Sequence, residues 1–497
     1  MAVAERGRRW LPWAVAVLCL LPRLPGLDSP LLGNGHAWRQ SLTAMMARNF
    51  ARHGHRLAWA EVDMVAWDEH GIRRVPGYTD AEFPLYPWLV AQVYRVTGPE
   101  LWVARLCSAL CGVAICLCLF FLGRELWGDW AGAVAAGFFG LSPLAVFYTR
   151  AVLPEPLMYA CAVCAVWQLV VWAQGDARAR RALVVALVAL TVAAMLKLTS
   201  LHLLVPAVVA GWLAAGRQAP RRAGCWLLVV VPVLATVAWY AWAYHLGQTY
   251  FSHFPILGSR AARGGLVNWD LWRKGVESFY PRFVFTVLIL VGNITGWAVA
   301  LLALGRVRDR REWVVWAWLG ITLAQMVVLA GATISHFYYN LAFVLPLSLV
   351  IGRGASRWDK PRLRWMATVL ALIGPVLTVA GPLVPSWYDV TAGEVAAARA
   401  ANRLTAPDEL IYTLSFGPQM LYEADRRGDF MLAQNDKLNP LAVRQAAAVG
   451  FALFATGRAD LLGKPAGAAL AAELARWPLV AHGPGWAVWD LRSGNKR

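Results

Sequence analysis

The side chains best suited to chemistry gather in one polar stretch, about residues 28–82, between the first apolar run and the next. Its motifs are GHAWRQ (Gly35 to Gln40), EVD (Glu61 to Asp63), WDEH (Trp67 to His70) and DAEFPLYPW (Asp80 to Trp88). Histidines and carboxylates act as general bases or metal ligands, and arginine is a common partner of phosphate groups. Because the chain is otherwise mostly apolar up to residue 386, this loop is where a reaction is expected.

The first motif predicts an amphipathic helix. Its polar residues recur at helical spacing and share one face: His36, Arg39, Gln40 and Thr43. Tryptophan beside arginine is typical of a helix that lies in the membrane interface, so an interfacial anchor is one interpretation. The other is a polar face directed at a phosphate headgroup, with Arg39 as the charged donor and His36 as a base or metal ligand.

Glu82 stands directly before an apolar run that is broken by prolines. Other carboxylates and one histidine precede it in the same loop: Asp63, Asp68, Glu69, His70 and Asp80. Such a group suits a general base or a metal cluster. The spacing matches no specific metal motif, so it identifies no metal.

Charged residues recur at the predicted outer ends of later apolar runs. In FYTRAVLPEPLMY, Arg150 and Glu155 either form an ion pair that fixes the turn or serve a function. Lys197, in MLKLTS, either extends to the interface or reaches a lipid phosphate. In SHFYYN, the tyrosines fit the aromatic belt of a membrane protein, but His336, Tyr338 and Tyr339 also suit a phosphate or a sugar.

The composition is that of a membrane protein. The chain has 497 residues, of which 59% are hydrophobic and 15% charged, and its mean hydropathy is +0.49. A soluble protein carries about 25% charged residues. The net charge of +18 does not indicate nucleic acid, because the arginines lie between apolar runs. The eight cysteines lie in or beside apolar runs, so no disulfide framework is expected.

Apolar runs predict about eleven transmembrane helices, at about 20 residues per span. They cover residues 10–27, 100–121, 131–147, 153–174, 182–197, 199–215, 224–244, 277–304, 313–331, 337–352 and 366–385. We interpret the first as a retained span and not as a cleaved signal peptide. The basic loops all fall on one side when the N-terminus is cytoplasmic, which places the 28–82 loop, the 245–276 loop and the tail outside.

After residue 386 the pattern predicts a small outer α/β domain of about 110 residues. The strand-like segments are Leu410 to Phe416, Val449 to Ala455 and Trp486 to Leu491. The helix-like segments are Thr391 to Asn402 and Ala466 to Ala475. The expected organisation is therefore a polytopic helical membrane domain over residues 1–386 and an extracytoplasmic domain over residues 387–497.

Several motifs together resemble one family. They are HAWRQSLTAMMARNF, EFPLYPWLVAQVYRVTG, SPLAVFYTRAVLPEPLM, MLKLTS and SHFYYNLAFVLPL, in that order, with LYEADRRGDF in the tail. They are similar to the bacterial glycosyltransferases of the C-type (GT-C) fold that use polyprenyl-phosphate sugars. These are relatives of the protein O-mannosyltransferases and of the lipid A aminoarabinose transferase.

The resemblance implies an inverting transfer of a hexose or pentose at the outer face of the cytoplasmic (inner) membrane. The donor is a polyprenyl-phosphate sugar, the acceptor is a glycan, lipid or protein hydroxyl, and membrane lipids surround the enzyme. It implies no certain cofactor and leaves a divalent metal open, because some relatives bind one and others do not. Family members usually carry an acidic residue early in the first outer loop, where this chain has His36, with Asp28 nearer the span.

The sequence therefore predicts a membrane glycosyltransferase. The candidates for acceptor activation or metal binding are His36, Glu82 and Asp63. The candidates for the donor phosphate are Arg39, Arg150, Lys197, Tyr338 and Tyr339, with Gln40, Glu155 and His336 as further site residues. The alternative function is a transporter or flippase of a lipid-linked or polar solute, which would favour paired ions near mid-bilayer and repeated halves. A membrane scaffold that presents the tail domain is a third interpretation.

Overall fold

The computed structural model describes most of the chain. The described residues are 10–33, 35–54, 56–68, 70–72, 77–78, 82–250, 273, 277, 285–329, 333, 336–433 and 438–492. The chain divides into two compact units. The helical unit comprises Met1–Leu27, Arg105–Ala241 and Arg260–Pro385. The sheet-bearing unit comprises Asp28–Ala104, Trp242–Ser259 and Ser386–Arg497.

The apolar runs of the helical unit form helices. In a membrane the backbone N–H and C=O groups have no water to bond, so they must form hydrogen bonds with each other, as they do in a helix. The first helices along the chain are α2 (Leu11–Leu20), η1 (Leu21–Arg23), α5 (Leu101–Trp127), α6 (Asp129–Leu141), α7 (Pro143–Tyr148), α8 (Glu155–Gln174) and α9 (Ala179–Leu196). The later ones are η2 (Leu198–Leu203), α10 (Leu204–Ala215), η3 (Gly216–Arg221), α11 (Ala223–Thr249), η4 (Thr286–Val291), α14 (Ile294–Leu302), α15 (Glu312–Val328), η5 (Phe337–Asn340), α17 (Leu341–Ser356) and α18 (Pro361–Ala380). The short helix η6 (Pro385–Tyr388) follows, and all but its first residue belong to the sheet-bearing unit.

In the described residues, seven helices are long and apolar enough to cross a membrane, and two shorter apolar helices accompany them. The membrane-helix class is therefore confirmed, whereas the count of about eleven stays a prediction. Two expected spans are interrupted. The run 131–147 divides into α6 and α7 at Ser142, before Pro143. The run 277–304 has a break between η4 and α14, where Asn293 takes a positive φ of 53°.

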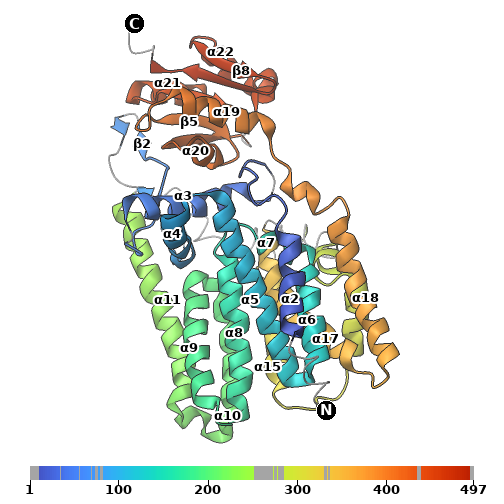
Figure 1. The fold of residues 1–497 in the computed structure, drawn as a ribbon. Helices are drawn as coiled ribbons and strands as arrows, with labels where there is room; N and C mark the ends of the chain where they lie inside the picture. Colours follow the sequence, from blue (N-terminus) through green and yellow to red (C-terminus); the bar gives the residue numbers. More distant parts are fainter. Residues whose placement is uncertain are drawn as a thin grey trace. The chain divides into compact units, whose positions relative to one another are not determined.

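The helices of this unit pack closely through small residues. Figure 1 shows α8, α9 and α10 side by side, and α8 contacts both α9 and α10. On the other side α17 packs against α6 and α14. A Cβ at Gly352 of α17 would come 2.3 Å from the Ala131 carbonyl, and one at Gly354 only 2.1 Å from the Val299 carbonyl. Glycine at these positions lets the backbones approach, as is common between membrane helices.

The C-terminal part of the sheet-bearing unit is the expected α/β domain. Its sheet has the order β6-β5-β7-β9-β8. Figure 1 labels two of these strands, β5 and β8, together with the helices around the sheet. The strands are β5 (Ile411–Ser415), β6 (Gly428–Leu432), β7 (Leu453–Thr456), β8 (Leu479–Gly483) and β9 (Trp486–Asp490). β5 runs parallel to β6 and β7, and β9 runs antiparallel to β7 and β8. The helices are α19 (Ala392–Leu404), α20 (Gln419–Ala424), α21 (Pro440–Val449), α22 (Ala468–Leu474), η7 (Ala459–Gly463) and η8 (Pro465–Gly467).

The three strands and two helices expected in the tail are confirmed as β5, β7, β9, α19 and α22. The sequence pattern missed β6 and β8. β6 starts at a glycine, and β8 is an exposed edge strand that ends at a glycine, so neither shows a sustained apolar alternation.

The loop of residues 28–82 belongs to the same unit as the tail. It forms α3 (Ala37–His53) and the short strands β1 (Glu61–Val62), β2 (Trp67–Asp68), β3 (Gly71–Ile72) and β4 (Gly77–Tyr78), and α4 (Leu85–Thr97) follows. β1 pairs with β4, and β2 with β3. Val65 lies in the core of the α/β domain, against which Trp67 and Ile72 pack. The indole of Trp67 donates to the Asp429 carboxylate at 2.6 Å, so the loop is tied to the tail domain by burial and hydrogen bonding.

Candidate functional site

Lys197 and Glu155 form an ion pair in the helical unit. α9 ends at Leu196, where Lys197 leaves the helix in an extended conformation (φ −159°, ψ 123°). Glu155 is the first residue of α8, so the partial positive charge of that helix end also favours its carboxylate. Lys197 is 5% exposed and Glu155 is fully buried. A buried pair of opposite charges is therefore placed where two adjacent helices end and begin.

Two tyrosines cover the lysine. The Lys197 Nζ lies 4.6 Å from the ring centroid of Tyr338 and 4.5 Å from that of Tyr339. The two rings stack on each other, with centroids 4.9 Å apart. The His336 ring lies 5.6 Å from the Tyr338 ring and 6.1 Å from the Tyr339 ring. The electron-rich faces attract the ammonium, so the aromatic residues help to hold its charge in place.

Two further tyrosines support this cluster, and sequence reasoning did not select them. The Tyr159 hydroxyl donates to the Tyr338 carbonyl at 3.0 Å. The Tyr148 ring meets the Tyr338 ring edge-on, with centroids 5.8 Å apart. Both lie inside the FYTRAVLPEPLMY motif that contains Glu155, but only Tyr159 shares a helix with Glu155, four residues further along α8, whereas Tyr148 ends α7.

The cluster has the chemistry of an oxyanion site. A lysine ammonium has three N–H donors, and Glu155 accepts one of them. The second carboxylate oxygen of Glu155, Oε2, is buried and has no hydrogen-bond partner in the part of the chain that the structure describes. A charged donor beside tyrosines suits a phosphate oxygen, and an unsatisfied carboxylate oxygen suits a donor hydroxyl.

Arg150 contacts the backbone near the end of the first helix instead of Glu155. Its guanidinium donates to the carbonyls of Pro25 and Gly26, both at 2.5 Å. Arg105 donates to Gly26 and to Leu27, at 3.1 and 2.9 Å. The alternative of an Arg150–Glu155 ion pair is therefore wrong, because Arg150 donates to these backbone carbonyls and the ion pair of Glu155 is with Lys197. Arg105 was not selected from the sequence.

The helix expected after Gly35 forms as α3, in the sheet-bearing unit, but residues of its predicted polar face, such as Arg39 and Gln40, are as buried as those of its apolar face. His36 precedes it with a left-handed backbone (φ 58°, ψ 39°), and the Gln40 amide donates to the Gly35 carbonyl at 2.9 Å. Non-glycine residues adopt this conformation rarely, and it costs energy. The helix therefore begins in a tight turn that sets the position of His36.

Arg39 of α3 forms an ion pair with Glu82, which lies just before α4. The two side chains are 11% and 12% exposed, respectively. The pair joins two residues that the sequence assigned to different roles, phosphate binding for Arg39 and acceptor activation for Glu82. α3 and α4 contact each other, so the pair is built by helix packing.

Asp63 lies in a separate, buried network. Its carboxylate accepts from Arg48 at 2.6 Å and from Asn49 at 2.9 Å, and Arg48 also reaches Asp425 at 3.0 Å. Burial lowers the pKa of the Arg48 guanidinium, but Asp63, Tyr422 and Asp425 raise it above its ordinary value. Asp63 thus links the first loop to the tail domain, and its role in acceptor activation stays a prediction.

The structure does not identify a metal centre. Among the described residues, no group of three or more His, Cys, Asp or Glu side chains is arranged to hold a metal ion. Glu69 and Asp80, which the sequence grouped with Glu82, lie outside the described residues. All eight cysteines are described and are free thiols, as expected for a chain without a disulfide framework.

The eleven predicted site residues fall into separate groups. Lys197, Glu155, Tyr338, Tyr339 and His336 form one cluster, and Arg150 lies elsewhere in the helical unit. His36, Arg39, Gln40 and Glu82 are gathered around the start of α3, and Asp63 belongs to the Arg48 network of the same unit.

Comparisons with known proteins support the resemblance. Residues 80–242 match a family model described as dolichyl-phosphate-mannose-protein mannosyltransferase. No curated protein sequence matches the chain. The crystal structure of ArnT from Cupriavidus metallidurans bound to undecaprenyl phosphate is 14% identical, with a TM-score of 0.64, and the match covers 96% of this chain and 97% of that one.

A second solved structure has the same fold. It is the archaeal oligosaccharyltransferase AglB from Archaeoglobus fulgidus, in complex with an inhibitory peptide and a dolichol-phosphate. The identity is 12% and the TM-score 0.61, with 91% of this chain and 69% of that chain covered. The predicted GT-C fold, with its helical membrane domain and sheet-containing C-terminal domain, is therefore confirmed.

Proposed function

We propose, from the fold that this chain shares with ArnT and AglB, that it is an integral-membrane glycosyltransferase. It moves a hexose or pentose from a polyprenyl-phosphate donor to an acceptor hydroxyl, with inversion, on the outer face of the cytoplasmic membrane. The observation that carries this proposal is the buried Lys197–Glu155 pair under Tyr338 and Tyr339, because such a cluster suits the phosphate of a lipid carrier.

The proposal assigns the donor phosphate to the cationic residues of the sequence motifs. Lys197 donates to a phosphate oxygen, and the hydroxyls of Tyr338 and Tyr339 supply neutral donors. His336 is a further donor beside the two rings. Charge develops on the phosphate as the bond from the anomeric carbon to the phosphate oxygen breaks. A cation already in place stabilises that charge without costly reorganisation.

Glu82 is the proposed base for the acceptor. Its carboxylate takes the hydroxyl proton while the acceptor oxygen bonds to the anomeric carbon, and the polyprenyl phosphate leaves with the electron pair. Arg39 holds the carboxylate in position through its ion pair. His36 and Asp63 are the remaining predicted candidates, of which His36 lies at the turn before the same helix.

The orientation of the protein is also part of this proposal. The N-terminus is cytoplasmic and the tail domain lies outside, as the distribution of basic loops predicts. Residues 1–386 then carry the transfer reaction and residues 387–497 form the outer domain. The packing of Val65 in the core of the tail domain supports a tail that positions the first loop.

Purified full-length protein, given a panel of radiolabelled polyprenyl-phosphate sugars and membrane extract as acceptor, tests the proposal. Wild type should transfer or release the sugar of one donor. E82Q should lower kcat by about 10²- to 10⁴-fold, the usual contribution of a general base. E100Q is the matched control, since Glu100 is exposed between α4 and α5.

Two results would contradict the proposal. Turnover by E82Q at the rate of E100Q would remove Glu82 as the base. No turnover of any donor by correctly folded wild-type protein would favour transport of a lipid-linked solute, which uptake into proteoliposomes then measures.

A further inference from the structure

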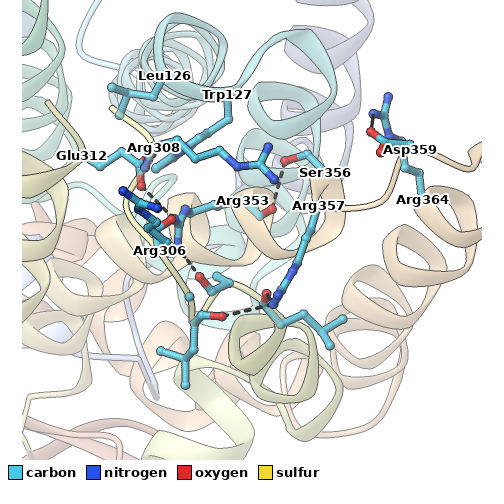
Figure 2. A pocket seen from close by; sticks show the side chains of 14 residues that line it. Leu126, Trp127, Arg306, Arg308, Glu312, Arg353, Ser356, Arg357, Asp359 and Arg364 are labelled. Carbon is cyan, nitrogen blue, oxygen red and sulfur yellow. Dashed lines mark hydrogen bonds and ion pairs between the residues drawn. The ribbon is translucent and has the colours of Figure 1, made fainter. Parts of the chain in front are cut away.

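A basic pocket lies in the helical unit, among helix ends other than those that carry Lys197 and Glu155. It has a volume of about 390 Å³, within the range of small-ligand sites. Five arginines and two carboxylates line it: Arg306, Arg308, Arg353, Arg357, Arg364, Glu312 and Asp359. Figure 2 shows Arg306, Arg308 and Arg353 gathered together, with Asp359 and Arg364 further away. The pocket therefore carries an excess of positive charge.

Two of the arginines have structural roles. Arg353 pairs with the buried Glu312 at 3.0 Å and donates to the carbonyls of Ala303 and Arg306. Arg357 donates to the carbonyls of Leu302 and Leu304, at 2.8 and 3.1 Å. These bonds satisfy the carbonyls at the end of α14 and build the wall of the pocket.

The charge of Glu312 is already compensated. One of its oxygens accepts the backbone N–H groups of Arg308 and Asp309, both at 3.2 Å, and the other faces Arg353. Glu312 therefore closes the loop before α15 and offers little attraction to the remaining arginines.

Among the described residues, Arg306 and Arg308 have no structural role of this kind. Both are exposed, and within the ranges given above neither side chain has a hydrogen-bond or ion-pair partner. Arg364 lies at the same pocket, where its Nε donates to the Trp358 carbonyl and its ion pair with Asp359 is long, at 4.0 Å. Guanidinium groups that converge on one cavity form a fork-shaped donor set that matches the oxygens of a phosphate group.

The surroundings of the pocket are apolar and aromatic. Leu126, Trp127 and Leu304 contribute to its lining. Trp313 and Trp365, the second residue of α15 and the fifth residue of α18, are 54% and 59% exposed. Exposed tryptophans of this kind are typical of the membrane–water interface. A lipid with an anionic headgroup would pair its charge with the arginines of the pocket and its acyl chains with the apolar surroundings.

We propose that this pocket binds the phosphate group of an anionic phospholipid, at the end of the bundle that the sequence predicts to be cytoplasmic. Basic pockets between membrane helices on that side are known to bind lipid headgroups. The phosphate would lie against Arg306 and Arg308, with the acyl chains beside Trp313 and Trp365. The site is separate from the proposed donor cluster, since none of its lining residues belongs to that cluster.

Native mass spectrometry of the purified full-length protein tests this proposal, with dioleoyl phosphatidylglycerol as the probe and dioleoyl phosphatidylcholine as the neutral comparison. Wild type should bind phosphatidylglycerol preferentially, and R306Q/R308Q should weaken this binding by about tenfold or more, the effect of a lost charge-assisted hydrogen bond. The matched control is R217Q/R222Q, which removes the same charge from exposed arginines of another predicted cytoplasmic loop. The control should bind like wild type.

Equilibrium dialysis with radiolabelled inorganic phosphate distinguishes the source of the anion. Phosphate binding that is lost in R306Q/R308Q, without preference for phosphatidylglycerol, would keep the site and assign it to a soluble phosphate compound. Equal loss of lipid in both double variants would show general attraction to basic loops and overturn the proposal. The same conclusion would follow if neither probe distinguished wild type from R306Q/R308Q.

Discussion

Lys197 and Glu155 pair in the interior of the helical unit although each stands at the end of a different helix. Burying two charges is costly, and their mutual attraction offsets that cost only while both are present. Stability therefore requires that both charges be present or both absent, whereas the proposed binding of phosphate requires Lys197 itself.

A double-mutant series separates these requirements. K197M leaves Glu155 buried without its cation and should destabilise the protein by about 3–5 kcal/mol. K197M/E155L removes both charges and should recover most of the thermal unfolding temperature, but sugar transfer should stay at least about tenfold below wild type because a charged donor is lost.

Thermal unfolding in detergent and the transfer assay are the two measurements for this series, with K464M as the control at an exposed lysine of the tail domain. If K197M/E155L transferred sugar at the wild-type rate, Lys197 would have a purely structural role.

Kinetics of Arg39 variants can distinguish two roles for this residue, the positioning of Glu82 and the binding of the donor phosphate. If Arg39 positions Glu82, R39Q should lower kcat by about tenfold and leave the KM of the donor nearly unchanged. If Arg39 binds the donor phosphate, as the sequence alone suggested, KM should rise instead. Its observed ion pair favours the first outcome. R39K should retain part of the activity, since it keeps the charge and loses the planar geometry.

Arg48 and Arg52 provide a matched pair for stability, because both contact Asp425. Arg48 is buried and also holds Asp63, so R48Q should cost about 3–5 kcal/mol. Arg52 and Asp425 are 43% and 38% exposed, so R52Q should cost less than about 1 kcal/mol. Thermal unfolding measures both. Equal shifts would show that Arg48 does not link the first loop to the tail.

The buried carboxyl of Glu394 should make the stability of the protein depend on pH. It is buried in the first turn of α19, and burial raises the pKa of its carboxyl to about 7, although Arg458 opposes the shift. The folded state then binds the proton more tightly than the unfolded state. The free energy of unfolding should therefore fall as pH rises from about 4.5 to about 7, by up to about 3 kcal/mol.

E394Q should remove this dependence. Its unfolding temperature should match wild type near pH 4.5 and exceed it at pH 8, as followed by circular dichroism of the purified protein. E409Q, at the partly exposed Glu409, is the control and should follow wild type at both pH values. A constant difference between E394Q and wild type across this range would contradict the prediction.

Local features of the sequence determined much of this protein. The length of the apolar runs predicted the helices, because a span needs about 20 apolar residues wherever it lies in the chain. The polar periodicity after Gly35 predicted α3, and the motifs around Glu155, Lys197 and Tyr338 identified residues that do lie together. The composition after residue 386 predicted the α/β character of the tail and three of its strands, but not that the first loop belongs to the same unit.

Only the tertiary structure decided which charges are partners. Glu155 is five residues from Arg150, yet it pairs with Lys197, because α9 packs along α8 and brings its end to the start of α8. Asp63 looked like a candidate base beside Glu82, yet Arg48 and Asn49 hold it in a buried network. Attraction between charges depends on distance and burial, which spacing along the chain does not determine. The residue types follow from the sequence, but their roles depend on how the helices pack.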